Sequence, residues 1–156
     1  MEPRRVVITG LGALTPIGNT LPEYWEGLIS GTSGAAPITY FDASKFKTQF
    51  ACELKGFDPL NFMDRKEARK NDRFAQYALV STQEAIEDSG LDLDKIDKDR
   101  VGVIWGAGIG GLETFQNEVL NFASGDGTPR FNPFFIPKMI ADIAPEIGRA
   151  SCRERV

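Results

Sequence analysis

The chain has 156 residues, of which 42% are hydrophobic and 26% charged, the composition of one globular domain or of part of one. Its formal net charge of −4 argues against a general nucleic-acid binder, because such proteins usually present a basic surface. No apolar run approaches the roughly 18 residues that span a bilayer, and the first residues do not form a signal peptide. We therefore expect a cytoplasmic protein that binds neither membrane nor nucleic acid.

The first half of the chain contains one predicted strand and one predicted helix, each with clear local signals. A β-branched apolar run over residues 4–10 predicts a buried parallel strand. Leu21–Ser30 predicts a helix, because Pro22 stands near its start and Gly31 follows its end. Three apolar side chains should form the buried face of this helix: Trp25, Leu28 and Ile29. Residues 31–62 predict mostly ordered loop, with one strand at Gln49–Leu54.

The second half alternates helical and strand patterns. Asp72–Asp88 predicts the strongest helix, because small and apolar residues recur along it every three or four positions. Val101–Trp105 predicts a second buried strand, followed by a glycine turn at residues 106–111 and a helix through Leu112–Phe122. The prolines of residues 131–137 exclude a central strand, and their aromatic neighbours predict a covered surface.

The end of the chain differs in composition from the rest. Residues 146–156 contain three arginines and few apolar residues, so they offer no face for a core. We place a domain at residues 1–144 and expect residues 145–156 to be a disordered tail.

The glycine turn allows two interpretations. Gly106, Gly108 and Gly111 match the G-x-G-x-x-G pattern of dinucleotide-binding sites, between a predicted strand and a predicted helix. That site also needs a further strand ending in an acidic residue about 20 residues later, where this chain has glycines and prolines. A close-packed turn is the stronger interpretation, and dinucleotide binding remains an alternative.

A basic segment also allows two interpretations. Arg65 and Arg69 stand one helical turn apart, and Lys66, Lys70 and Arg73 should follow an adjacent stripe. On composition alone, a solvated helix face is favoured, because acidic residues are interspersed. The alternative is a docking surface for an acidic protein or a phosphate-bearing carrier.

The two cysteines offer no catalytic centre. Cys52 alternates with apolar neighbours and should point inward as a small apolar side chain. Cys152 lies among arginines that could favour its thiolate, but the chain contains no histidine to assist it. With two cysteines and no histidine we expect reduced thiols and no metal site.

Four ordered motifs carry a resemblance to a known family. Residues 4–19, 65–72, 106–112 and 133–137 closely resemble the β-ketoacyl-acyl-carrier-protein synthases, and the similarity extends over Val6–Ala144. The resemblance implies an α/β chain, the incomplete N-terminal half of a thiolase-like layered fold, whose intact members are homodimers. It also implies a condensing enzyme of fatty-acid synthesis that needs no cofactor of its own, since phosphopantetheine arrives on the acyl carrier protein.

The resemblance further implies roles for individual residues. Four basic residues match carrier-docking positions: Lys66, Arg69, Lys70 and Arg130. Ile109 matches the position that gates the acyl chain, and Phe134 and Phe135 match an aromatic segment near the dimer contact that helps line the acyl pocket. An acidic carrier with a phosphopantetheine arm suits a basic surface, so the resemblance favours docking over a solvated face.

The resemblance ends after Ala144, before the family's catalytic residues. In the family, an active cysteine accepts the acyl group and two histidines assist decarboxylation and attack, and all three lie further along the chain. Cys152 lacks the small apolar surroundings of that cysteine. We therefore expect a truncated fragment that is inactive alone, with a non-catalytic partner subunit of the same fold as the alternative.

Overall fold

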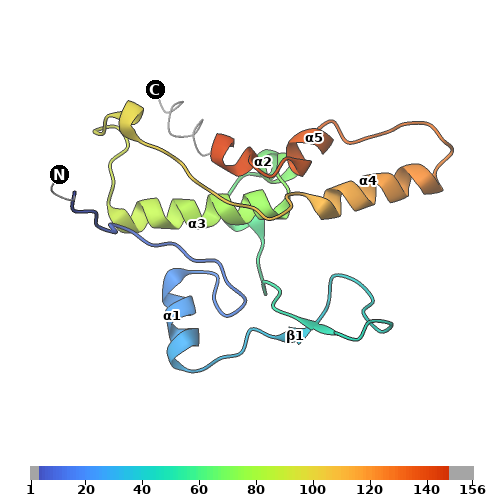
Figure 1. Ribbon diagram of the computed structural model, residues 1–156, viewed down its shortest axis with the longest axis horizontal. Helices are drawn as coiled ribbons and strands as arrows, with labels where there is room; N and C mark the ends of the chain where they lie inside the picture. Colours follow the sequence, from blue (N-terminus) through green and yellow to red (C-terminus); the bar gives the residue numbers. More distant parts are fainter. Residues whose placement is uncertain (1–3, 148–156) are drawn as a thin grey trace. The chain divides into compact units, whose positions relative to one another are not determined.

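The computed structural model describes residues 4–147, which form two compact units (Figure 1). The first unit comprises the residues up to Asp58 together with Ser81–Leu91, and the second comprises Pro59–Val80 and the residues from Asp92 onward. The elements in chain order are α1 (Leu21–Ile29), β1 (Ala36–Pro37), β2 (Phe50–Ala51), η1 (Pro59–Asn61), α2 (Arg65–Lys70), α3 (Arg73–Ser89), η2 (Lys98–Arg100), α4 (Leu112–Ser124) and α5 (Phe135–Met139).

Helix α1 confirms the helix predicted at residues 21–30. The Thr20 hydroxyl caps its first turn by accepting a hydrogen bond from the Glu23 N–H, and Gly31 follows its end with a φ of 69°. Its predicted buried face is wrong. Gly27 is buried, whereas Trp25, Leu28 and Ile29 are exposed. The reason is that α1 approaches Ile17 through Gly27: a Cβ there would lie 2.9 Å from the Ile17 carbonyl oxygen.

The N-terminal segment follows the second half of α3, and two carboxylates on that helix hold it. Asp88 Oδ2 accepts a hydrogen bond from the Leu11 N–H at 2.8 Å. Glu84 accepts two, from the N–H groups of Ala13 at 2.7 Å and Leu21 at 2.6 Å. A Cβ at Gly12 would lie only 2.0 Å from the Ser81 carbonyl oxygen, so the two backbones touch.

The strand predicted at residues 4–10 is wrong for this structure. Within residues 4–147 these residues pair with no other strand, and the side chains of Val6 and Ile8 are 89% and 81% exposed. A β-branched sequence favours an extended backbone, but a strand also needs hydrogen-bonding partners from another segment.

The sheet that the structure describes in residues 4–147 is a short antiparallel ribbon of two strands. Strand β1 pairs with β2 in the register Ala36 to Ala51 and Pro37 to Phe50. Strand β2 lies inside the predicted strand at residues 49–54 but is only two residues long. Cys52 is exposed, so the prediction that it points inward is wrong. An isolated two-stranded ribbon has no second layer to cover either face.

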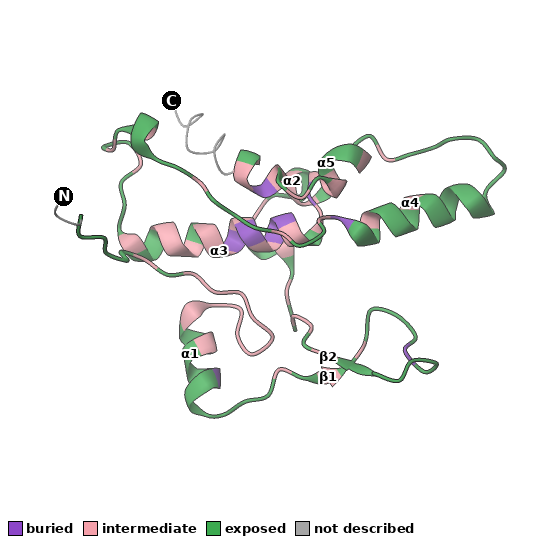
Figure 2. Cartoon of the chain, in the orientation of Figure 1, coloured by how far each residue is buried: buried purple, intermediate pink, exposed green. Residues whose placement is uncertain are grey.

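The first half of α3 carries the small core of the second unit. Ala75 and Ala78 are buried together with Ala144, and Phe74 and Ile143 pack against them (Figure 2). The helix predicted at residues 72–88 is thereby confirmed, as is the close packing expected of its small residues. Because the buried side chains are mostly alanines, this core removes little apolar area from water.

The second predicted strand, Val101–Trp105, is also wrong for this structure. Its residues form no strand, and the Ile104 side chain is 97% exposed. The helix that should follow the glycine turn is confirmed as α4, and it packs against α5. No residue of α4 is buried, so its apolar side chains lie partly open to solvent (Figure 2).

Two further predictions concern the whole chain and its end. Among the helices of residues 4–147, none combines the length and the apolar composition that crossing a membrane requires. The backbone is helical at residues 143–147, which include the start of the segment predicted to be disordered. Residues 148–156, with Cys152, lie outside the described residues.

Candidate functional site

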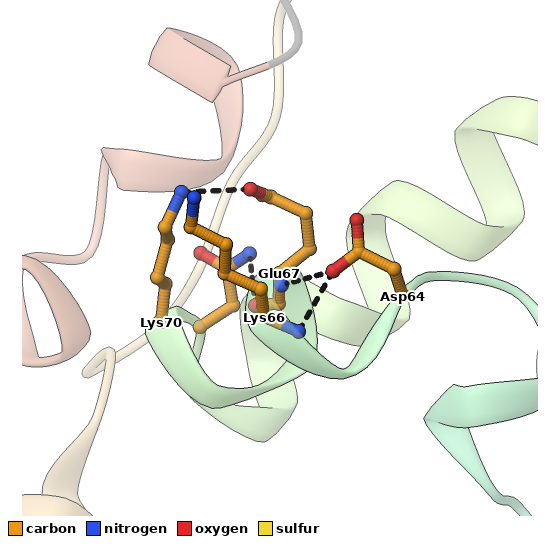
Figure 3. A network of polar contacts seen from close by, with 5 residues as sticks. Asp64, Lys66, Glu67 and Lys70 are labelled. Atoms are coloured by element: carbon orange, nitrogen blue, oxygen red, sulfur yellow. Dashed lines mark hydrogen bonds and ion pairs between the residues drawn. The ribbon is translucent and has the colours of Figure 1, made fainter.

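Helix α2 is a short basic helix that Asp64 caps. Asp64 Oδ1 accepts hydrogen bonds from the N–H groups of Lys66 at 2.7 Å and Glu67 at 2.8 Å (Figure 3). The hydrogen bond from the Glu67 N–H is the main reason that the pKa of Asp64 lies below its usual value. The charged carboxylate therefore fixes the first turn of the helix and faces its N-terminus.

The cations of α2 differ in how far they are neutralised. Lys70 Nζ forms an ion pair with Glu67 Oε1 at 2.8 Å, and this hydrogen bond raises the pKa of Lys70 (Figure 3). The side chains of Arg65, Lys66 and Arg69 are exposed, and no acidic group in residues 4–147 forms an ion pair with them. These three cations are available to an anionic partner.

The predicted basic stripe does not continue to Arg73. Helix α2 ends at Lys70, and Asn71 takes an extended backbone conformation with φ −104° and ψ 140°. Arg73 begins α3, and its Nε lies 3.8 Å from Glu113 Oε2 on α4. The break follows from the Asn-Asp pair at residues 71–72, since both residue types compete with the helix backbone for hydrogen bonds.

The joint between α2 and α3 is held by two buried amide side chains. Asn71 Nδ2 donates to the Glu67 carbonyl at 3.2 Å. Gln76 Nε2 donates to the carbonyls of Ala68 at 2.9 Å and Asn71 at 3.2 Å. Breaking a hydrogen bond of a buried polar group costs free energy. These hydrogen bonds therefore fix the orientation of α2 on α3.

Arg130, the fourth predicted docking residue, lies in the segment between α4 and α5. Its Nη2 is 3.0 Å from Asp126 Oδ2, and both side chains are exposed. Figure 1 shows this segment turning beyond the end of α4 and running back to α5. No hydrogen bond or ion pair described for residues 4–147 joins Arg130 to α2, and its docking role stays a prediction.

The glycine turn is close-packed at its end and open at its start. Gly110 has a φ of 81°, and a Cβ at Gly111 would lie 2.1 Å from the Lys138 carbonyl oxygen. At Gly106 and Gly108 a Cβ would meet no atom within 4 Å. Ile109, the predicted gate, is 71% exposed. This turn does not follow a strand, so the dinucleotide alternative lacks the context that it requires.

Four aromatic rings form a stack that we call the phenylalanine ladder: Phe115, Phe135, Phe131 and Phe122. Successive ring centroids are 6.3, 5.7 and 5.7 Å apart, and the planes of successive rings are inclined by 17°, 21° and 29°. Of these four residues, the sequence indicated only Phe135 as a pocket residue and missed the other three. The spacing of Phe115 and Phe122 on one helical face was the available signal.

Phe134, the other predicted pocket residue, is not part of the phenylalanine ladder. It is the residue that precedes the first turn of α5, and its side chain is 38% exposed. The structure therefore brings Phe135 to the ladder and leaves Phe134 and Ile109 outside it.

Comparison with known proteins places these features in a family. Residues 3–150 match the family described as β-ketoacyl synthase, N-terminal domain. The chain is 47% identical over 144 residues to 3-oxoacyl-[acyl-carrier-protein] synthase 2 of Synechocystis sp., and 46% identical over 144 residues to the synthase of the same name from Coxiella burnetii. Each match covers 92% of this chain, which spans 34% of the length of either relative.

Solved ketosynthase structures share the fold of the chain. A type II PKS ketosynthase in complex with its acyl-carrier protein matches with a TM-score of 0.77 and 25% identity, over 97% of this chain and 39% of its own. The ishigamide ketosynthase/chain length factor matches with a TM-score of 0.76 and 28% identity, over 97% of this chain and 38% of its own. A β-ketoacyl synthase from Burkholderia phymatum gives a TM-score of 0.73.

These likenesses confirm the predicted fold class, the incomplete N-terminal half of a thiolase-like layered α/β fold, although the two predicted buried strands are not formed in residues 4–147. The family match covers nearly the whole sequence, and it agrees with the basic, glycine and proline-aromatic motifs in their order along the chain. The chain therefore belongs to the β-ketoacyl synthase family, of which it holds the N-terminal domain.

Proposed function

We propose that this chain is the N-terminal part of a 3-oxoacyl-[acyl-carrier-protein] synthase that elongates fatty acyl chains. The observation that carries the proposal is the identity of 46–47% to synthases of that name over 92% of the chain. The reaction would be the decarboxylative Claisen condensation of an acyl carrier thioester with malonyl carrier protein.

The chemistry would depend on residues outside this sequence. A cysteine thiolate would attack the acyl thioester and release the carrier thiol. Loss of CO₂ from malonyl carrier protein would then give a carbanion equivalent that attacks the acyl enzyme and frees the cysteine. This chain has no histidine to assist either step, and Cys52 lies exposed beside a two-stranded ribbon. We therefore expect this polypeptide alone to be inactive.

The contribution of this chain would be to bind the acyl carrier protein. Helix α2 supports this role, because Arg65, Lys66 and Arg69 are exposed and form no ion pair within residues 4–147. Carrier proteins present an acidic helix, and opposite charges guide association and fix its register. Lys70 and Arg130 would contribute less, since each already has an acidic partner.

The apolar residues would contribute to the site for the acyl chain. Phe135 belongs to the phenylalanine ladder, whose rings are partly exposed and offer apolar surface. We propose that Phe134 and Ile109 border the same path, and that phosphopantetheine on the carrier is the only prosthetic group involved. A cytoplasmic homodimer without membrane or nucleic-acid partners would complete the enzyme.

A non-catalytic partner subunit of the same fold is the second candidate. One similar solved structure is a ketosynthase/chain length factor, but the identity to it is 28%. The synthases of Synechocystis sp. and Coxiella burnetii are 47% and 46% identical. The higher identity favours the synthase.

A chimeric enzyme tests the proposal. Residues 1–144 of this chain would replace the matching part of the Synechocystis sp. synthase, and condensation of acyl carrier protein with malonyl carrier protein would be measured. We expect the chimera to be active and this chain alone to fall below about one-thousandth of its rate, because the nucleophile is missing.

The control is the same chimera with its catalytic cysteine changed to alanine, which should bind carrier protein without condensing. Covalent acylation of this chain alone would contradict the proposal. So would a folded chimera that binds carrier protein but does not condense.

A further inference from the structure

Asp72 connects three helices of the second unit. It lies between the last residue of α2 and the first residue of α3, and its carbonyl accepts a hydrogen bond from the Gln76 N–H at 3.0 Å. Its carboxylate Oδ2 accepts a hydrogen bond from Thr114 Oγ1, in the first turn of α4. The same oxygen lies 3.1 Å from the position that a Cβ would occupy at Gly111. Asp72 therefore contacts the end of the glycine turn and the start of α4.

Hydrogen bonds from neighbouring side chains fix Asp72 relative to α2. The residue before it, Asn71, is buried, and its side chain binds the Glu67 carbonyl. Gln76 binds the Ala68 carbonyl in the last turn of α2. A change in the mobility of α2 therefore reaches Asp72 through the hydrogen bonds of two buried residues, Asn71 and Gln76, rather than through a flexible loop.

The connection from Asp72 to the glycine turn is equally tight. The Gly111 N–H donates to the Met139 carbonyl at 3.3 Å, and a Cβ at Gly110 would lie 2.5 Å from the same carbonyl oxygen. The end of the turn thus lies between Asp72 on one side and the last residues of α5 on the other. Opening of this turn would break the contact of Gly111 with Met139.

A second link between α3 and α4 is weaker. Arg73 Nε lies 3.8 Å from Glu113 Oε2, and the two side chains are 46% and 56% exposed. Exposed ion pairs at such distances contribute little to stability. The Thr114 hydroxyl bound to Asp72 is half-buried and so is the stronger of the two connections.

We propose that Asp72 is a positioning residue that couples α2 to the glycine turn, so that a carrier protein bound to α2 stabilises the hydrogen bond between Gly111 and Met139. The proposal rests on the proposed docking of an acyl carrier protein. A partner that immobilises α2 restricts the joint at Asn71 and Asp72, and the restricted joint holds Thr114 and Gly111 in place. Ile109, on the same turn, is held with them.

Matched substitutions at Thr114 test this coupling. Thr114→Val keeps the shape of the side chain and removes the hydroxyl, whereas Thr114→Ser keeps the hydroxyl. The readout is the hydrogen-exchange rate of the Gly111 amide in the full chain, measured by NMR without and with saturating acyl carrier protein. We expect the carrier protein to slow exchange about fivefold or more in the unmodified chain and in Thr114→Ser. In Thr114→Val the slowing should fall below about twofold.

The ratio of the Gly111 exchange rates without and with carrier protein distinguishes a coupling role of Thr114 from a purely structural one. A merely structural role of Thr114 would change exchange equally with and without carrier protein and leave the ratio unaltered. Equal slowing in Thr114→Val and the unmodified chain would overturn the coupling, as would carrier binding that leaves the Gly111 rate unchanged. No binding to the unmodified chain would instead overturn the docking function, and the coupling with it.

Discussion

Reversing the charges of Lys66 and Arg69 together is expected to weaken the binding of acyl carrier protein at least about tenfold, a loss of roughly 1.4 kcal/mol. Both side chains are exposed and form no ion pair within residues 4–147, so the substitutions remove attraction without breaking a described contact. Lys66→Glu with Arg69→Glu would also repel an acidic partner. Isothermal titration calorimetry of each chain with carrier protein measures the change.

The control changes the same amount of charge at a different place. Lys45→Glu with Lys47→Glu alters two exposed lysines of the loop between β1 and β2 in the first unit. We expect its affinity to stay within about twofold of the unmodified chain, because neither lysine belongs to α2 and exposed charges that do not contact a partner contribute little at physiological salt. Equal weakening by both double variants would show that net charge matters and that α2 does not.

Gly110→Ala is expected to destabilise the second unit by about 3 kcal/mol or more. Gly110 has a φ of 81°, which alanine rarely adopts, and the added Cβ would lie 2.5 Å from the Met139 carbonyl oxygen. The nearest atoms are backbone atoms of Met139 and Ala141, so no side-chain rotation relieves the clash. Native-state hydrogen exchange at the amides of Ala75 and Ala78, in the core of the unit, measures the loss.

Gly108→Ala is the matched control in the same turn. A Cβ at Gly108 would meet no atom within 4 Å, and Gly108 is not among the glycines with positive φ. Its stability should stay the same or rise slightly, since alanine restricts the unfolded chain more than glycine does. Similar destabilisation by both substitutions would contradict the view that only the end of the turn is close-packed.

The helices could be predicted from the sequence because their signals are local. Thr20, Pro22 and Gly31 mark the ends of α1, and the small-residue spacing marks α3. Which face of α1 is buried could not be predicted, because Gly27 rather than Trp25 approaches its neighbour. Amphipathic spacing indicates an apolar face but does not determine whether another element covers it.

The strands could not be predicted reliably, because their formation depends on segments that are distant in the sequence. Residues 4–10 and 101–105 have the composition of buried strands, yet pairing depends on distant segments, and within residues 4–147 neither segment pairs with another strand. The prediction that Cys52 points inward failed in the same way. Apolar residues that alternate along a strand are buried only where a second layer covers that face, and no such layer covers this ribbon within residues 4–147.

The candidate site was predicted in composition but not in arrangement. The basic segment forms a helix as expected, but the hydrogen-bonding preference of Asn71 and Asp72 ends it before Arg73. Arg130 pairs with Asp126 four residues away, a local partner that a motif match does not reveal. The roles of Asp72 and Thr114 depend on a contact across 42 positions, for which one sequence carries no signal.

The location of the carrier contact is the most direct test of the account. A carbodiimide joins lysine amines to carboxylates in direct contact, and mass spectrometry of the digested complex identifies the joined lysine. We predict that acyl carrier protein is joined to Lys66 of α2. Joining to Lys45, Lys47 or Lys95 while Lys66 remains unmodified would contradict the claim that this helix is the docking surface.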